Sequence, residues 1–286
     1  MNGDQTIPRL MFVTDSRFDR YQLETICVEA VEGGVDAIQL RAPSMEKRKR
    51  ACLARALQNR LGGRARLLIN TDMSLAKELN CGLHLPEAGA HPRDLRGFLS
   101  DGVLLGRSVH SECEARNSGG ADYVLAGNVF STLSKPGSSG IGPIGLRLIV
   151  AAASAPVLAI GGITKANAAK VIDAGGSGVA VIRAISESTN PRAAARSLRD
   201  VIDAALAERT VMVKSIDPTP IQVTVNGKTV QLFAQSTVGD FLSSRGLQER
   251  LLVVELNRES LERSLYATTV LVDGDSIEVV HAIGGG

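Results

Sequence analysis

The 286-residue sequence contains no tryptophan, and aromatic residues make up only 3% of it. Because stacking on aromatic rings is a common way of holding single-stranded nucleic acid, this scarcity and a net charge of only +2 argue against a nucleic-acid partner. The longest nearly apolar run, residues 148–160, is interrupted by Ser154 and Pro156 and is too short to cross a bilayer. No basic segment followed by an apolar one begins the chain. We therefore expect a cytoplasmic protein with no membrane partner.

The sequence also lacks any pattern of cysteines that binds metal or forms disulfides. Its four cysteines form no C-x-x-C pair and no cluster with histidine, so neither a structural zinc site nor a disulfide framework is expected. We expect reduced thiols buried in the core at all four positions, Cys27, Cys52, Cys81 and Cys113.

What the sequence does contain is a regular alternation of short apolar runs and helical patterns between residues 9 and 209. Eight such units follow one another, and their apolar runs are too hydrophobic for strands that face water. The first run ends in Thr14-Asp15-Ser16, not in the G-x-G-x-x-G turn of an open dinucleotide-binding sheet. The alternation predicts an α/β domain, a (β/α)₈ TIM barrel, over residues 1–209.

A second, smaller domain is expected after a linker at residues 210–220, where Pro218 and Pro220 occur and helical periodicity ceases. Beyond the linker, two alternating runs flank Asn226-Gly227, a strong hairpin signal. A short helix and further strands follow, one of them over residues 269–271. This order predicts an α+β domain of the β-grasp, ubiquitin-like type over residues 221–286.

A glycine pair, Gly161-Gly162, separates an apolar run from the helical pattern that follows it. Glycines at the carboxyl end of a strand let a phosphate approach backbone N–H groups, and barrels of this type bind phosphate after their seventh and eighth strands. The pair therefore indicates a phosphate site. Ordinary packing of a helix on a strand remains the alternative explanation.

Several short motifs are distinctive. The first domain contains INTD (Ile69–Asp72), GRSVHS (Gly106–Ser111), ADYVLAGNVFSTLSK (Ala121–Lys135) and AIGGIT (Ala159–Thr164). The second contains VNGK (Val225–Lys228), VVELN (Val253–Asn257), DGD (Asp273–Asp275) and a terminal GGG. Through these motifs, residues 9–207 resemble the thiamine phosphate synthase/TenI superfamily, and residues 221–286 resemble the ThiS-like sulfur carrier of thiamine biosynthesis.

The superfamily includes two reactions, and departures from its pattern bear on the choice between them. The synthase joins a pyrimidine pyrophosphate to a thiazole phosphate and uses Mg²⁺, which requires oxygen ligands. Where its pattern has one lysine and two aspartates, this chain has Pro43, Thr71 and Gly89. Asp72 or Glu87 are the candidate substitutes for the missing ligands. These losses favour the other branch, a thiazole tautomerase with no metal cofactor; Mg²⁺ is expected only if the barrel is a synthase.

The tautomerase reaction moves a proton on a thiazole carboxylate phosphate, and imidazole suits this because its pKa lies near neutrality. His110 follows the fifth expected strand, and the resemblance to the tautomerase branch makes it our candidate for this acid and base. A structural histidine shared by the whole superfamily is the alternative for His110. His84, at the end of the fourth expected strand, competes with it, although a buried structural role is favoured there.

The remaining candidate residues bind the substrate. Polar residues just past strand ends, including Asn70 and Ser108, should converge on one rim of a barrel. The resemblance assigns the phosphate to Thr132, Ser134, Gly162 and the backbone of Ile182 and Arg183, and it leaves helix capping as an alternative for the two hydroxyls. The full set of expected binding residues is Arg41, Asn70, Ser108, Asn128, Thr132, Ser134, Lys135, Gly161, Gly162, Ile182 and Arg183.

The sulfur-carrier resemblance gives the end of the chain a function. Gly285 and Gly286 would form a tail without side chains whose terminal carboxylate is activated by an adenylyltransferase and converted to a thiocarboxylate. Thiazole synthase would receive the sulfur. The expected partners are therefore a thiazole phosphate, thiazole synthase and the adenylyltransferase.

Three functions of the barrel remain open from the sequence. The first is the thiazole tautomerase, the second is a thiamine phosphate synthase with altered metal ligands, and the third is a non-catalytic barrel that binds thiazole phosphate. The sequence favours the first.

Overall fold

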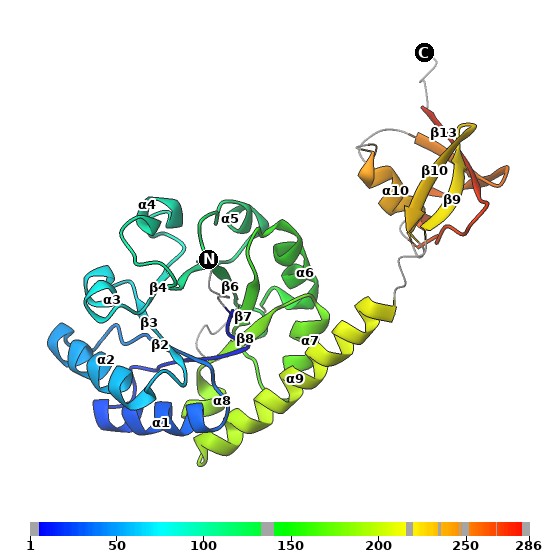
Figure 1. Cartoon of the computed structure of the whole chain (residues 1–286). Helices are drawn as coiled ribbons and strands as arrows, with labels where there is room; N and C mark the ends of the chain where they lie inside the picture. Colours follow the sequence, from blue (N-terminus) through cyan, green and yellow to red (C-terminus); the bar gives the residue numbers. More distant parts are fainter. Residues whose placement is uncertain are drawn as a thin grey trace. The chain divides into compact units, whose positions relative to one another are not determined.

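A computed structural model describes residues 6–132, 140–215, 220–233, 236–245, 247, 252–266 and 268–281. The chain divides into two compact units, Met1–Arg209 and Thr210–Gly286. Figure 1 shows the first unit as a ring of strands surrounded by helices and the second as a smaller sheet beside a helix.

The first unit is a closed barrel of eight parallel strands that follow one another around the ring in chain order (Figure 1). The first strand closes the ring, because Met11 lies opposite Ala37 of the second strand and opposite Ala180 of the eighth. The predicted (β/α)₈ barrel is confirmed. The strands are β1 (Leu10–Val13), β2 (Ala37–Leu40), β3 (Arg66–Asn70), β4 (Gly82–Leu85), β5 (Leu105–Val109), β6 (Tyr123–Gly127), β7 (Val157–Ile160) and β8 (Gly178–Val181).

Helices connect the strands on the outside of the ring (Figure 1). One of them, over residues 183–186, is too short to produce a periodic pattern, which is why the sequence does not reveal it. The helices that begin in this unit are α1 (Arg20–Glu32), α2 (Lys47–Leu61), α3 (Met73–Leu79), α4 (Pro92–Arg96), α5 (Glu112–Arg116), α6 (Gly142–Ala152), α7 (Ala168–Asp173), α8 (Arg183–Ser186) and α9 (Pro191–Ser215).

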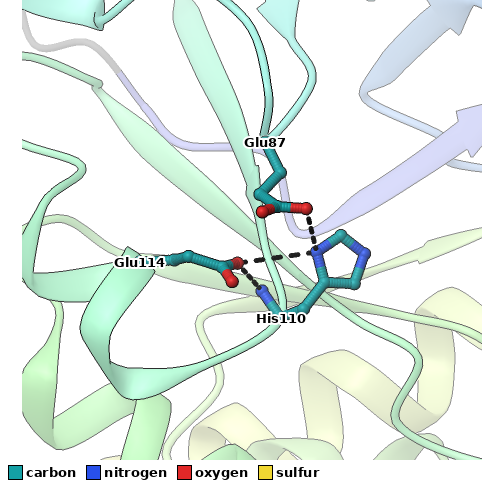
Figure 2. Close-up of side chains that lie close together, drawn as sticks. All are labelled: Glu87, His110 and Glu114. Carbon is teal, nitrogen blue, oxygen red and sulfur yellow. Dashed lines mark hydrogen bonds and ion pairs between the residues drawn. The ribbon is translucent and has the colours of Figure 1, made fainter.

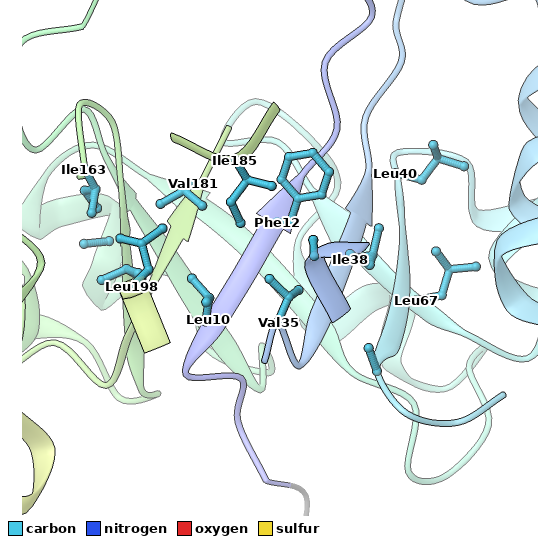
Figure 3. Close-up of a cluster of buried hydrophobic side chains, with 14 of the residues drawn as sticks. Leu10, Phe12, Val35, Ile38, Leu40, Leu67, Ile163, Val181, Ile185 and Leu198 are labelled. Carbon is cyan, nitrogen blue, oxygen red and sulfur yellow. The ribbon is translucent and has the colours of Figure 1, made fainter. Parts of the chain in front are cut away.

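Successive side chains of each strand point to opposite faces, and both faces are buried. The outward residues of β1 and β2, among them Leu10, Phe12, Ile38 and Leu40, are fully buried in the layer between strands and helices (Figure 3). The inward residues form a second cluster inside the barrel. It contains Met11, Val13, Ala37, Leu68, Leu104, Tyr123, Leu125, Leu158 and Ala180.

Tyr123 is the largest side chain inside the barrel, and it needs the glycine beside it. A Cβ at Gly106 of β5 would overlap the Tyr123 ring, so the absence of a side chain at Gly106 makes room for the phenol. The Tyr123 hydroxyl lies 2.9 Å from Nδ1 of His84, which is 1% exposed. Burial lowers the pKa of His84 to about 3, with a further contribution from the positive charge of Arg41, so this imidazole is neutral near pH 7.

The second unit is a five-stranded sheet packed on one helix, as expected for a β-grasp domain. Val270 forms only an isolated bridge with Thr237, so the strand predicted over residues 269–271 is wrong. A short edge strand over residues 259–261 was not predicted. The elements are β9 (Pro220–Val225), β10 (Lys228–Phe233), α10 (Val238–Ser244), β11 (Leu252–Leu256), β12 (Glu259–Leu261), the 3₁₀ helix η1 (Arg263–Leu265) and β13 (Ser276–His281), in the sheet order β10-β9-β13-β11-β12.

The predicted linker, residues 210–220, is shorter than expected. Helix α9 continues to Ser215, and β9 already begins at Pro220. The sequence from 192 to 215 has no glycine or proline to end the helix, and Pro218 is the first proline after it that disfavours helical backbone in the preceding residue. Helical periodicity therefore persists through half of the segment that we assigned to the linker.

The cysteines differ in exposure, contrary to the prediction that all four lie in the core. Cys27 and Cys81 are buried, Cys52 is half-buried and Cys113 is exposed. Cys113 lies on the solvent side of the five-residue helix α5, whose buried residue is Ala115.

None of the described helices is both long and apolar enough to span a bilayer.

Acidification is expected to destabilise the barrel through His84. Its folded-state pKa of about 3 lies below the ordinary value of 6.5, so the unfolded chain binds more protons between these values. The contribution of His84 to the free energy of unfolding is therefore fully present above its ordinary pKa of 6.5. It is lost as the pH falls toward 3, with a slope of at most about 1.4 kcal/mol per pH unit. Urea unfolding of the full chain, read by hydrogen exchange of barrel peptides, measures this slope. His84→Gln should flatten the curve, and an unchanged slope would contradict the assignment.

Substitution at Gly106 tests the packing inside the barrel. Gly106→Ala should lower the free energy of unfolding by about 1–3 kcal/mol, because the added methyl group overlaps the Tyr123 ring. Gly97→Ala is the matched control, since a Cβ there meets open space, and it should change stability by less than about 0.5 kcal/mol. Equal effects of the two substitutions on the urea midpoint would show that the Tyr123 contact is unimportant.

Candidate active site at the carboxyl ends of the strands

Polar side chains replace apolar ones inside the barrel near the carboxyl ends of β2 and β3. Gln39 is 2% exposed and donates from Nε2 to Oδ1 of Asn70 over 2.9 Å. Its other amide atom, Oε1, has no hydrogen-bond partner among the described residues. Because an unpaired buried carbonyl oxygen is costly, Gln39 Oε1 is suited to accept a hydrogen bond from a water or a ligand at this point. We did not predict Gln39 as a binding residue; the lone amide in the apolar strand AIQL was the available signal.

Ser108 lies on the next part of this rim, in β5, and is half-buried. Its Oγ is 2.9 Å from Nε2 of His84. The second ring nitrogen of His84 faces Tyr123, so both nitrogens are used within the barrel. His84 is therefore buried, as the sequence favoured, and contacts the rim only through Ser108.

His110 directly follows β5, and its Nδ1 faces two carboxylates (Figure 2). Its Nδ1 is 3.7 Å from Oε2 of Glu87 and 3.6 Å from Oε2 of Glu114. The three side chains are 40%, 48% and 30% exposed for His110, Glu87 and Glu114 respectively, so the group is open to solvent. The two carboxylates and the imidazole all have ligand atoms within 4.8 Å of one another.

Local sequence explains how Glu114 reaches His110. Ser111 is the N-cap of α5 and accepts from the backbone N–H of Glu114, which holds Glu114 in the first turn. The Glu114 carboxylate in turn accepts from the backbone N–H of His110 over 2.6 Å. Sequence reasoning missed Glu114, although Ser111 and Glu114 have the spacing of a capping box.

Two carboxylates and one imidazole suit a divalent cation, because carboxylate oxygens are the common protein ligands of Mg²⁺ and Mn²⁺, and imidazole binds several transition metals. The same arrangement also suits proton transfer, since a carboxylate beside one ring nitrogen fixes the orientation of the imidazole. The donor set therefore fits either chemistry.

Asp72 is not available as a substitute metal ligand. Its carboxylate is the N-cap of α3, accepting from the backbone N–H of Leu75, and pairs with Arg50 at 3.3 Å. Thr71, at the aspartate position of the synthase pattern, has a left-handed backbone with φ of 65° and no carboxylate. Of the two substitutes that the sequence suggested, only Glu87 points toward other candidate residues.

The Gly161-Gly162 turn follows β7 and is packed against the segment after β6. Its φ values of +104° and +63° favour glycine. A Cβ at Gly161 would overlap the Asn128 carboxamide, and a Cβ at Gly162 would overlap the Ser131 carbonyl oxygen. Asn128 Nδ2 is buried and has no hydrogen-bond partner among the described residues. The turn thus places the backbone of Gly161 and Gly162 beside one buried amide donor.

The other predicted binding residues have different surroundings. Arg41 is exposed just after β2, and its guanidinium makes no hydrogen bond or ion pair within the described parts of the chain. Ile182 is the N-cap of α8, and the Arg183 side chain pairs with Glu187 at 2.8 Å. Thr132 is half-buried after β6. The predictions for Ser134, Lys135, Gly285 and Gly286 concern positions outside the described residues.

A cavity of about 530 Å³ opens at the opposite end of the barrel, among residues that begin β3 and β4. Its lining includes Arg66, Gly82 and Leu104. It contains none of the predicted site residues, and those within the described part of the chain lie at or just after the carboxyl ends of the strands.

Comparisons with known proteins connect these observations to a family. The TMP-TENI family, described as thiamine monophosphate synthase, matches residues 10–185, and the ThiS family matches residues 223–286. The thiamine-phosphate synthase of Methanoculleus marisnigri is 39% identical over 206 residues, covering 70% of this chain and 97% of that protein. The corresponding synthase of Moorella thermoacetica is 40% identical over 62% of this chain and 86% of its own.

A solved structure supports the same conclusion. The thiamine phosphate pyrophosphorylase from Pyrococcus furiosus superposes with a TM-score of 0.63 and 31% identity, covering 69% of this chain and 96% of its own. The names of these relatives agree with the synthase alternative of the sequence analysis and do not support the tautomerase that it favoured. This chain belongs to the thiamine monophosphate synthase (TMP-TENI) family, carries a C-terminal ThiS-family domain, and is an enzyme of thiamine biosynthesis.

Proposed function

We propose that the barrel is a thiamine-phosphate synthase, which joins a pyrimidine pyrophosphate to a thiazole phosphate and releases pyrophosphate. The names of relatives that match it over most of their length support this choice. The observation that carries it is the pair of carboxylates, Glu87 and Glu114, beside His110 at the mouth of the barrel. They offer the oxygen ligands that the chain lacks at positions 71 and 89.

In this reaction the bond between carbon and the pyrophosphate oxygen breaks, and the electron pair leaves with the pyrophosphate. The thiazole ring nitrogen forms the new bond to that carbon with its lone pair. Glu87, Glu114 and His110 would hold a divalent cation, which, when bound, counters the negative charge on the departing group. The missing aspartates therefore do not by themselves argue against a synthase, because carboxylates from other positions reach the same rim.

The chain's own residues would bind and orient the two substrates. Arg41 has a guanidinium free to pair with phosphate oxygens, and the Gly161-Gly162 turn lets a phosphate approach the backbone. Gln39 Oε1 would accept a hydrogen bond from an N–H group of a substrate, so that this buried oxygen gains a partner when substrate binds.

A thiazole tautomerase is the second candidate, supported by His110 itself. Its Nδ1 faces the two carboxylates, while Figure 2 shows the other ring nitrogen directed away from them. An imidazole held in this way can take a proton on its outer nitrogen and return it. In that case Glu87 and Glu114 would orient the ring and bind no cation.

For the second unit we propose a sulfur carrier that acts through the terminal glycine. A ThiS-family domain fused to a barrel of the same pathway supports this function. An adenylyltransferase would activate the carboxylate of Gly286, and thiazole synthase would receive the sulfur.

The two barrel activities are separated by assaying the full chain with each substrate set. We expect thiamine phosphate from pyrimidine pyrophosphate and thiazole phosphate, and only with Mg²⁺ or Mn²⁺ present. Glu87→Gln should lower kcat/KM by about 10–100-fold, because a ligand of the cation is lost. It should also raise the Mg²⁺ concentration that gives half of the maximal activity.

Asp72→Asn is the matched control, because asparagine keeps the N-cap of α3 while removing a carboxylate, and the Mg²⁺ requirement should stay the same. Aromatisation of the thiazole carboxylate phosphate without metal, combined with no thiamine phosphate, would instead establish the tautomerase.

The carrier proposal predicts a change at the end of the chain. Incubation of the full chain with ATP, a sulfur donor and the adenylyltransferase of the pathway should replace one oxygen of the Gly286 carboxylate with sulfur. Intact-mass spectrometry detects that replacement, and a chain lacking Gly286 serves as the control. An unchanged mass in the full chain, under conditions that convert an isolated ThiS-family carrier, would contradict the proposal.

A further inference from the structure

Three side chains from adjacent strands form a continuous hydrogen-bonded row inside the barrel. The Tyr123 hydroxyl on β6 lies 2.9 Å from His84 Nδ1 on β4, and His84 Nε2 lies 2.9 Å from Ser108 Oγ on β5. Tyr123 is 0% exposed and His84 is 1% exposed, whereas Ser108 is half-buried. The row thus runs from the closed interior to the rim where substrates bind.

The buried end of the row, Tyr123, determines which group donates and which accepts in each hydrogen bond. The Tyr123 hydroxyl has no other hydrogen-bond partner among the residues that the structure describes. If it accepted a proton from His84, its own O–H would be buried without an acceptor, which is costly. Burial also raises the pKa of Tyr123, so the phenol keeps its proton. Tyr123 therefore donates to Nδ1 of His84.

A neutral imidazole that accepts at Nδ1 carries its proton on Nε2. Burial lowers the pKa of His84 to about 3, which excludes the doubly protonated ring near neutral pH. Nε2–H therefore donates to Ser108 Oγ, and the Ser108 hydroxyl proton is not used by His84. In the described structure Ser108 has no second partner, so that proton is available at the rim.

We propose that Tyr123 and His84 are positioning residues that make the Ser108 hydroxyl a hydrogen-bond donor to an anionic oxygen of the substrate. This inference rests on the proposed function, because it takes the ligand to be a phosphate or pyrophosphate. If every hydrogen bond of the row ran the other way, the Ser108 oxygen would face the ligand as an acceptor. It would then bind an N–H group and repel an anionic oxygen. Gly106 contributes by leaving room for the Tyr123 ring.

The direction of the row can be measured without a variant. In ¹⁵N-labelled full chain, the chemical shifts of the two His84 ring nitrogens report which of them carries the proton. We expect the Nε2–H tautomer near pH 7. The Nδ1–H tautomer would overturn the proposal, and this readout does not depend on whether the barrel is a synthase or a tautomerase.

The effect on the ligand is tested with inorganic pyrophosphate as the probe, by calorimetry on the full chain. Ser108→Ala should weaken binding about three- to tenfold, and Tyr123→Phe should weaken it by a similar or smaller factor, because His84 can then accept the serine proton. The double variant Ser108→Ala/Tyr123→Phe should bind no more weakly than Ser108→Ala alone.

Independent effects of the two substitutions would overturn the inferred row, since Tyr123 would then act by another route. Tyr123→Phe keeps the ring that fills the barrel, and its urea midpoint shows whether the fold is retained. The chain could show the expected tautomer and the expected non-additive binding and still form no thiamine phosphate. That result would contradict the proposed reaction but not the inferred hydrogen-bonded row.

Discussion

The pairing of β8 with β1 is the interaction on which the rest of this structure depends. It turns eight parallel strands into a closed ring, so that strands far apart in the sequence end on the same rim. Closure also fixes what must fill the interior. Apolar side chains occupy most of it, while Gln39, Asn70, His84 and Ser108 bring polar atoms to its carboxyl half. The candidate site is thus a consequence of the barrel's closure together with polar residues at a few inward positions.

Much of this architecture could be predicted because it is periodic in the sequence. Eight apolar runs, each followed by a helical pattern, are a strong signal, and the Asn226-Gly227 turn reveals the change to a different kind of domain. Features without a period were missed. Helix α8 has four residues, Val270 forms a single bridge, and nothing in residues 192–215 marks where α9 ends. Cys113 is exposed because it lies on the outer side of a short helix. The prediction that every cysteine is buried used the residue type alone and did not consider its place in a helix.

The site shows a different limit. Sequence motifs assign ligands to fixed positions, so the absence of carboxylates at 71 and 89 indicated a barrel without metal. The fold brings Glu87, from the loop after β4, to Glu114, from the helix after β5, and no sequence pattern predicts that these two meet at His110. Asp72 looked equivalent to Glu87 in the sequence, yet it caps α3 and pairs with Arg50. Under the proposed function, the carboxylates that bind the cation come from neighbouring loops of the barrel while the rim stays the same.

The most direct test of this account is the position of a cation in a crystal of the full chain soaked with Mn²⁺ and pyrophosphate. Anomalous scattering locates manganese independently of any assumption about its ligands. The account predicts a manganese peak within bonding distance of the Glu87 and Glu114 carboxylates, with pyrophosphate beside it. A peak elsewhere on the rim, or pyrophosphate bound with Glu87, His110 and Glu114 in contact only with one another, would contradict it.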